Sequence, residues 1–232
     1  MKRTLAEEAV GENYDRDKML EARHRTFTAI ERIAASIRPG MKESEGIALA
    51  KSILKEMGLL RGWHGVFVRF GENTICAYDE KNAPDLVLKD NDIFYIDVGP
   101  VFKKWEADAG DTFVVGNDPE MHRAARDVRK IFDLVREKWL KDRISGRELY
   151  DFAEAAAASL EWQLCTDVTG HRLADFPHKA FHSGALAEAD FPPSAELWVL
   201  EIQIRHRSRP IGAFFEDLLL ESGRWNSSLV TT

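Results

Sequence analysis

The stretch YIDVGPVFKKWEADAGDTFVVG, residues 95–116, decides the fold, because its alternation predicts two antiparallel strands joined by a turn. A turn at Phe102-Lys103 would place Asp97 directly across from Asp108, with both side chains on one face of the hairpin. Like charges at opposed positions destabilise a sheet, and burial increases the cost. Protonation of one acid, a neighbouring Arg or Lys, or a metal ion could relieve the repulsion. A surface hairpin with two solvated acids would need none of these.

The composition is that of a soluble globular protein. The 232 residues are 44% hydrophobic and 31% charged, with a formal net charge of -7. This negative charge disfavours a nucleic-acid surface, and no apolar run reaches the roughly 20 residues of a membrane helix. The first residues show no secretory signal, and Cys76 and Cys165 form neither a disulfide framework nor a zinc-finger spacing. We therefore expect a cytoplasmic protein with no nucleic-acid or membrane partner.

Helical periodicity and strand alternation follow one another along the chain. Helices are predicted over 15–37, 42–58, 117–139 and 145–160. Strands are predicted over 65–71, 73–78, 92–102, 105–116, 197–205 and 212–222. The order helices, strands, helices, strands predicts an α+β fold with mostly antiparallel strands. Because a helix pair followed by strands occurs twice, we expect two related halves packed into one domain.

Two further acids interrupt apolar strand patterns. Glu201 lies within LWVLEIQI and Glu216 within GAFFEDLLL, where an ionised acid is costly unless something compensates it. Each acid could instead be a strand-edge charge that discourages aggregation. His171 lies in a loop-like run, seven residues before His178. A lone histidine in such a place is more often a structural hydrogen-bonding group than a ligand.

Taken together, four carboxylates and one imidazole form a ligand set that suits Mn, Fe, Co or Zn. The set is Asp97, Asp108, His171, Glu201 and Glu216. One divalent ion cannot neutralise four carboxylates, whereas two ions about 3.5–4 Å apart would balance the charge and form a hydrolytic centre. The sequence therefore predicts two divalent metal ions, which would explain how the two acids of the hairpin tolerate one another.

The sequence resembles the methionine aminopeptidase, aminopeptidase P and prolidase family, the M24-type pita-bread metallopeptidases, over about 14–223. The family pattern is an Asp, a second Asp eleven residues later, a His after a Gly, and two later Glu residues. It matches the five residues above, with His171 following Gly170. The resemblance implies the pita-bread (creatinase/aminopeptidase) fold, in which helices cover a curved, mostly antiparallel sheet. It also implies one catalytic domain over 1–232 without a separate N-terminal domain, and 1–13 would be a flexible or extra helical segment.

The resemblance implies a role for each of the five residues. Asp108 and Glu216 would bridge the two ions, and Asp97 would chelate one of them. His171 and Glu201 would complete the shell of the other ion. Glu201 would also be the acid–base residue that handles the proton of the bridging water.

Other positions match the family less uniformly. His178 matches a further family histidine, which donates to the substrate carbonyl or to the tetrahedral intermediate. The family's histidine upstream of the hairpin is missing from GENTICAYDEKNAP, where Tyr78 could still donate to the substrate. Gly110 stands where the family often has a Thr, so a hydrogen bond of that Thr is lost. Arg205 belongs to a basic cluster that could bind a substrate carboxylate or could simply be solvated.

These features predict a dinuclear metallohydrolase that removes an N-terminal residue from a short peptide or splits an Xaa-Pro-type dipeptide. The DVGP run resembles the proline-directed branch, whereas the layout without an extra domain resembles the methionine enzymes, so the cleaved residue stays open. Two alternatives also stay open: a domain that binds a peptide or protein without cleaving it, and a hydrolase of a small non-peptide amide. A homodimer is compatible with the sequence, which does not indicate the oligomeric state.

Overall fold

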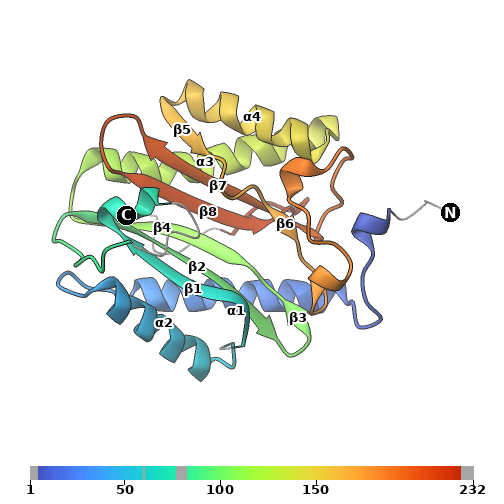
Figure 1. Cartoon of the computed structure of the whole chain (residues 1–232), viewed down its shortest axis with the longest axis horizontal. Coiled ribbons are helices and arrows are strands. Elements are labelled where there is room, and N and C mark those ends of the chain that lie inside the picture. The colour runs from blue at the N-terminus through green and yellow to red at the C-terminus, as the bar shows by residue number, and fades with distance from the viewer. Residues whose placement is uncertain (1–4, 60, 77–82, 226–232) are drawn as a thin grey trace.

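The structure is a computed structural model that describes residues 5–59, 61–76 and 83–225 of the chain. In this part, four α-helices lie against one curved sheet (Figure 1). The helices are α1 (Arg16–Ala34), α2 (Glu43–Glu56), α3 (Pro119–Asp142) and α4 (Gly146–Ser159). The strands are β1 (Gly62–Phe70), β2 (Asp92–Phe102), β3 (Trp105–Glu106), β4 (Ala109–Val115), β5 (Trp162–Cys165), β6 (His171–Arg172), β7 (Trp198–His206) and β8 (Gly212–Leu218). None of the described helices has both the length and the apolar character that crossing a membrane requires.

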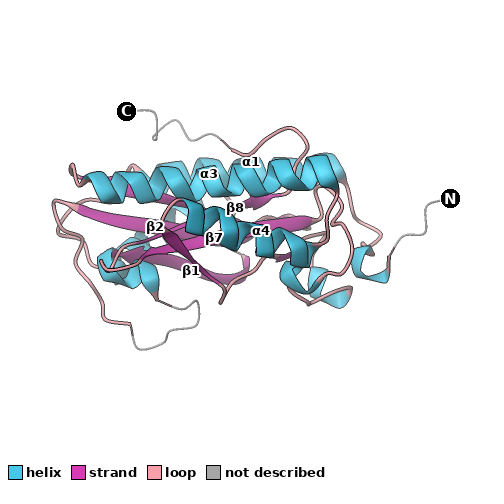
Figure 2. Ribbon diagram, turned by 90° about the horizontal axis from the view of Figure 1, so that it is seen from above, coloured by secondary structure: helices cyan, strands magenta, loops and turns pink. Residues whose placement is uncertain are grey.

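The sheet joins two halves, each built from a helix pair and antiparallel strands. Its order is β1-β2-β4-β8-β7-β5, with β3 paired to β2 and β6 paired to β7. Helices α1 and α2 lie along the strands of the first half and α3 and α4 along those of the second (Figure 1). Figure 2 shows the long helices α1 and α3 in one layer beside the sheet. The predicted α+β architecture is confirmed, since all named strand pairs of the described residues are antiparallel.

Acidic caps start the two long helices. The Asp15 side chain precedes α1 and accepts hydrogen bonds from the backbone N–H groups of Asp17 and Lys18, at 3.0 and 3.2 Å. Asp118 caps α3 in the same way, and Pro119 follows it at the first helical position. Such caps satisfy N–H groups that have no partner within the helix, and Pro at this position costs no hydrogen bond. The caps therefore determine where both helices begin.

The hairpin of β2 with β3 and β4 turns at Lys103-Lys104, one residue later than predicted. In the observed register Asp97 pairs with Gly110, so the predicted direct pairing of Asp97 with Asp108 is wrong. Lys103 has a φ of 57°, which allows a tight turn although neither turn residue is Gly or Asn. Asp108 precedes β4 and is a diagonal neighbour of Asp97. The repulsion between the two acids is thereby weaker than in a direct pair, but both remain buried.

The two halves meet where β4 pairs with β8, and Gly110 is opposite Glu216 at this seam. A β-carbon on Gly110 would lie 2.4 Å from Cε1 of Phe214 and 3.0 Å from Oε1 of Glu216. Glycine is therefore required at this position for space. The Thr expected from the family resemblance would displace the side chains that a neighbouring strand brings to the seam.

The described part of the 1–13 segment is fastened to the second half of the sheet. A short turn at Ala6–Glu8 carries the Glu8 carboxylate to Ser194, whose backbone N–H donates at 2.7 Å, and to Nε1 of Trp198 at 3.0 Å. Arg172 donates to the backbone carbonyl of Glu7. Because Arg172 directly follows His171, this segment supports the strand that carries a predicted ligand.

Candidate metal centre

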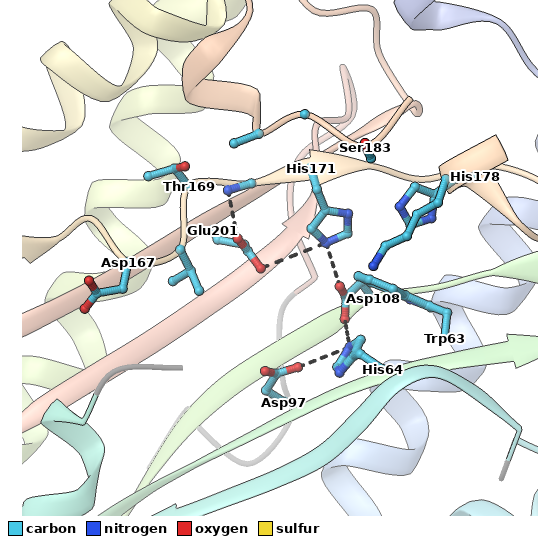
Figure 3. A pocket seen from close by; sticks show the side chains of 15 residues that line it. Trp63, His64, Asp97, Asp108, Asp167, Thr169, His171, His178, Ser183 and Glu201 are labelled. Atoms are coloured by element: carbon cyan, nitrogen blue, oxygen red, sulfur yellow. Dashed lines mark hydrogen bonds and ion pairs between the residues drawn. The ribbon is translucent and has the colours of Figure 1, made fainter. Parts of the chain in front are cut away.

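A cavity of about 300 Å³ lies where the two halves of the sheet meet. The first half supplies His64 from β1, Asp97 from β2 and Asp108 from the chain just before β4. The second half supplies His171 from β6 and Glu201 from β7 (Figure 3). Side chains that are far apart in the sequence therefore converge because the curved sheet brings their strands together.

All five predicted ligands reach this place, in two groups that share Asp108. Donor atoms of Asp108, His171, Glu201 and Glu216 lie within 4.8 Å of one another. Donor atoms of Asp97 and Asp108 form a second group with the same spacing, and this group also contains His64. Glu216 pairs directly with Glu201 across β7 and β8, which explains why two acids in separate apolar strands point to one place.

Two carboxylate oxygens indicate that this site fits a cation. Oδ1 of Asp97 and Oε1 of Glu216 are buried and accept no hydrogen bond within the described part of the chain. A buried carboxylate oxygen without a partner is costly, and a bound cation would supply the missing interaction. Carboxylate oxygens combined with imidazole nitrogens are donors that suit divalent ions such as Mn, Fe, Co and Zn. The residues present therefore fit the predicted metal ions.

Asp108 lies between two imidazoles. Its Oδ1 lies 2.9 Å from Nε2 of His64, and its Oδ2 lies 2.8 Å from Nε2 of His171 (Figure 3). Burial raises the pKa of Asp108, but the two imidazoles outweigh it and lower that pKa to about 2. Burial likewise disfavours the charged imidazoles, yet the Asp108 carboxylate raises the pKa of each, to about 9, with help from Asp97 at His64 and from Glu201 at His171. Without metal, the imidazoles thus balance the carboxylate charge.

The raised pKa values of Asp97 and Glu216 let these two carboxyl groups hold protons more readily than usual. Burial raises the pKa of Asp97 to about 7, where His64 opposes the rise and Asp108 adds to it. Burial also raises the pKa of Glu216 well above its ordinary range, and the carboxylates of Asp108 and Asp97 raise it further. The negative charge that the sequence predicts to be neutralised by metal is therefore partly neutralised by protons in the metal-free protein.

Binding of divalent ions to the metal-free protein should release roughly two to three protons per chain at pH 7, because ligands must lose their protons to bind metal. At that pH His64 and His171 are protonated, since their pKa values are about 9, and Asp97, with a pKa of about 7, is partly protonated. Affinity should therefore rise as the pH increases toward about 9 and fall as it decreases. Calorimetric titrations in two buffers of different ionisation enthalpy measure the release. Equal heats in both buffers would contradict this assignment of protons.

His178 lines the same cavity, and a buried glutamate holds it. Its Nδ1 lies 2.7 Å from Oε2 of Glu106, and its backbone N–H donates to Oε1 of Glu106 at 3.0 Å. A carboxylate partner makes Nδ1 the N–H donor and leaves Nε2 for other contacts. The ring stacks against His171 with 5.7 Å between centroids. Glu106 was not predicted from the sequence, although it is an acid two residues before Asp108 in a hairpin of buried residues.

The two predicted substrate-binding residues do not join this group. Tyr78 lies outside the described residues. Arg205 does not line the cavity but lies farther along β7, beside Trp162 and Arg207 in a separate hollow. Lys179, which was not singled out in the sequence, does line the cavity, and its Nζ lies 5.5 Å from the centroid of a Trp63 ring.

Comparisons with known proteins agree with this architecture. The model of metallopeptidase family M24 matches residues 17–220. A search of curated proteins finds no match.

Solved structures of peptidases share the fold at low sequence identity. The X-Pro aminopeptidase from Thermotoga maritima is 21% identical with a TM-score of 0.68, and the match covers 89% of this chain and 58% of that one. The prolidase from Pyrococcus horikoshii is 18% identical with a TM-score of 0.69, with coverages of 91% and 60%. The methionine aminopeptidase from Thermotoga maritima is 18% identical with a TM-score of 0.67, with coverages of 88% and 95%. The chain thus spans about three fifths of the first two relatives, and the predicted pita-bread fold is confirmed.

Proposed function

Because the chain belongs to metallopeptidase family M24, we propose that it is a dinuclear metal-dependent peptidase. It would remove an N-terminal residue from short peptides or split an Xaa-Pro-type dipeptide. The main support for the proposal is the position of Asp108, whose two oxygens face two separate groups of potential ligands. A carboxylate shared in this way is what a two-ion centre requires.

Five residues would hold the two ions. Asp97 would bind one ion, His171 and Glu201 the other, and Asp108 and Glu216 would contact both. When bound, the ions would lower the pKa of a shared water and polarise the scissile carbonyl. The buried oxygens of Asp97 and Glu216 that accept no hydrogen bond from the described residues support this assignment.

Glu201 and His178 are placed for proton transfer and for oxyanion stabilisation. Oε2 of Glu201 accepts a hydrogen bond from the backbone N–H of Gly170 at 2.7 Å, which fixes the carboxylate at the cavity wall. Its Oε1 lies 3.9 Å from Nε2 of His171, and in this group of potential ligands Glu201 could accept and return a proton. His178, oriented by Glu106, could donate from Nε2 to the developing oxyanion.

The cavity favours short peptides. Its volume of about 300 Å³ is at the lower end of the range of about 300–1,000 Å³ for small-molecule sites. Asp167 and Lys179 both line it, and opposite charges could pair with the two charged ends of a short peptide. Figure 3 shows Asp167 and His178 on opposite sides of the pair His171 and Glu201. Lys179 directly follows His178, so the two charges flank the proposed reaction centre.

Cleavage should depend on added metal and on His178. The protein is dialysed against a chelator, reloaded with Mn or Co, and assayed with Xaa-Pro and Met-Xaa peptides and small amides. We expect metal-dependent cleavage of at least one short peptide. His178→Ala should lower kcat by about 100- to 1,000-fold, as for other oxyanion donors, without changing the metal content.

A matched variant tests the choice of substrate. Lys179→Met should raise KM for dipeptides with a free carboxylate and leave KM for their C-terminal amides unchanged. Two bound ions without cleavage of any substrate in the panel would overturn the peptidase proposal and favour a domain that only binds peptides. Cleavage of small amides alone would replace the peptide substrate.

A further inference from the structure

We propose that His64 is an additional ligand of one metal ion, which it would hold together with Asp97 and Asp108. The inference rests on the proposed function, because it assumes that metal ions are bound. His64 would add a nitrogen donor to the ion that, by the family resemblance, only carboxylates would hold. His64 is not among the site residues predicted from the sequence, and it precedes 71–84, the stretch that lacks the family's histidine.

An irregularity in β1 directs His64 toward the cavity. Between Gly62 and Val66 the pairing advances four residues along β1 but only two along β2, from Pro100 to Val98. Extra residues of this kind bend a strand and re-aim its side chains. The side chain of His64 is consequently only 9% exposed and lines the cavity.

Gly99 gives the imidazole its space. A β-carbon at Gly99 would lie 2.1 Å from Nε2 and 2.0 Å from Cδ2 of His64, and 2.6 Å from Nε1 of Trp63. Contacts this short cannot be accommodated without moving both rings. Because Gly99 does not have a positive φ, glycine is needed here for close approach and not for an unusual backbone conformation. Strand β2 thus provides a gap for the ring that β1 supplies.

The position of Nε2 suits a metal ligand. Nε2 lies 2.9 Å from Oδ1 of Asp108 and 3.6 Å from Oδ1 of Asp97 (Figure 3). This Oδ1 of Asp97 is buried and accepts no hydrogen bond from a described residue. The nitrogen is therefore directed between two carboxylates, where a single cation could contact all three donor atoms, which lie within 4.8 Å of one another.

Asp108 then has one imidazole on each side. His171 faces its Oδ2, and the backbone carbonyl of Arg172, 2.6 Å from Nδ1 of His171, makes that nitrogen the N–H donor and leaves Nε2 to bind metal. His64 faces Oδ1 with the equivalent ring nitrogen. The ion site formed by Asp97, Asp108 and His64 would then contain a nitrogen donor. This donor should shift the metal preference of that site from Mn toward Zn or Co, because imidazole suits these ions better than carboxylate does.

Two substitutions test the ligand with different structural consequences. His64→Ala removes the imidazole, whereas Gly99→Ala keeps it but displaces it. Both should weaken the binding of one ion by about a hundredfold or more and leave the other ion in place, because even groups that only support a ligand contribute 10- to 100-fold. The preference for Zn over Mn at the affected position should decrease. His122→Ala, which removes a half-buried histidine that does not line the cavity, should change neither quantity.

A spectroscopic readout does not depend on activity. The Co-loaded wild-type protein should show paramagnetically shifted NMR signals from two imidazoles, and His64→Ala should show one. His64→Cys should keep both ions and add a thiolate-to-Co absorption band, which also controls for loss of the fold. Unchanged affinities, or an unchanged number of shifted imidazoles, in His64→Ala would overturn the proposal.

The outcomes separate this proposal from the peptidase proposal. Two imidazole signals in a protein that cleaves no peptide would support His64 as a ligand and reject the peptidase. An active His64→Ala variant with both ions bound at wild-type affinity would reject His64 as a ligand and leave the peptidase proposal intact. Reduced activity with both ions bound at wild-type affinity would assign His64 to substrate binding and would also reject the ligand proposal.

Discussion

Replacing Asp108 with alanine should weaken the binding of both divalent ions by more than about a hundredfold and remove peptidase activity. Among the described residues, Asp108 is the one that belongs to both groups of potential ligands. Its two oxygens face different imidazoles, so neither group keeps its shared carboxylate after the substitution. Asp97→Ala, by contrast, should lose one ion only, because Asp97 belongs to a single group.

The fold should survive the loss of Asp108. Asp97, Glu201 and Glu216 remain nearby, and removal of one carboxylate reduces their mutual repulsion in the metal-free protein. Elemental analysis and calorimetry measure the bound ions, and thermal unfolding of metal-free samples checks the fold. Asp167→Ala is the matched control, since Asp167 lines the same cavity but belongs to neither group. Wild-type metal content in Asp108→Ala would refute the shared-carboxylate arrangement.

Replacing Arg129 with methionine should lower the free energy of unfolding by about 3–5 kcal/mol. Arg129 on α3 is buried and forms an ion pair with Asp111 on β4, which is also buried. It also donates to the backbone carbonyl of Thr112 at 2.6 Å. Burial raises the pKa of Asp111 to about 6 even though Arg129 opposes the rise. Without Arg129, Asp111 would be a buried acid without its charged partner and would take up a proton.

A double variant separates the charge effect from the effect of lost packing. Arg129→Met combined with Asp111→Asn removes both charges and should recover most of the loss, because the cost comes mainly from leaving Asp111 buried without its charged partner, so that it must take up a proton. Denaturant unfolding of the metal-free proteins at neutral pH measures both variants. A single variant within about 1 kcal/mol of wild type would show that the pair does not secure β4 against α3.

Much of the fold and part of the candidate site could be predicted because their signals are local. Helical periodicity and alternation are visible within short windows, and they define four helices and the main strands. Glu201 and Glu216 were detectable because each places an acid in an otherwise apolar strand. The observed pairing of these two residues across β7 and β8 gives the physical reason for both signals.

The remaining features depend on geometry that short sequence windows do not show. The hairpin register depends on the positive φ of Lys103, which the residue type does not indicate. His64 reaches the cavity because β1 is irregular and Gly99 leaves a gap, and these two causes lie on different strands. Arg205 is near Glu201 in the sequence, but it lies farther along β7 and lines a separate hollow.

The most direct test of the two-ion centre is anomalous diffraction from crystals of the protein loaded with Mn or Co. We predict two anomalous peaks about 3.5–4 Å apart, one on each side of the Asp108 carboxylate. His64 and Asp97 should contact one peak, and His171 and Glu201 should contact the other. A single peak, or side chains that surround only solvent at saturating metal, would contradict the two-ion centre.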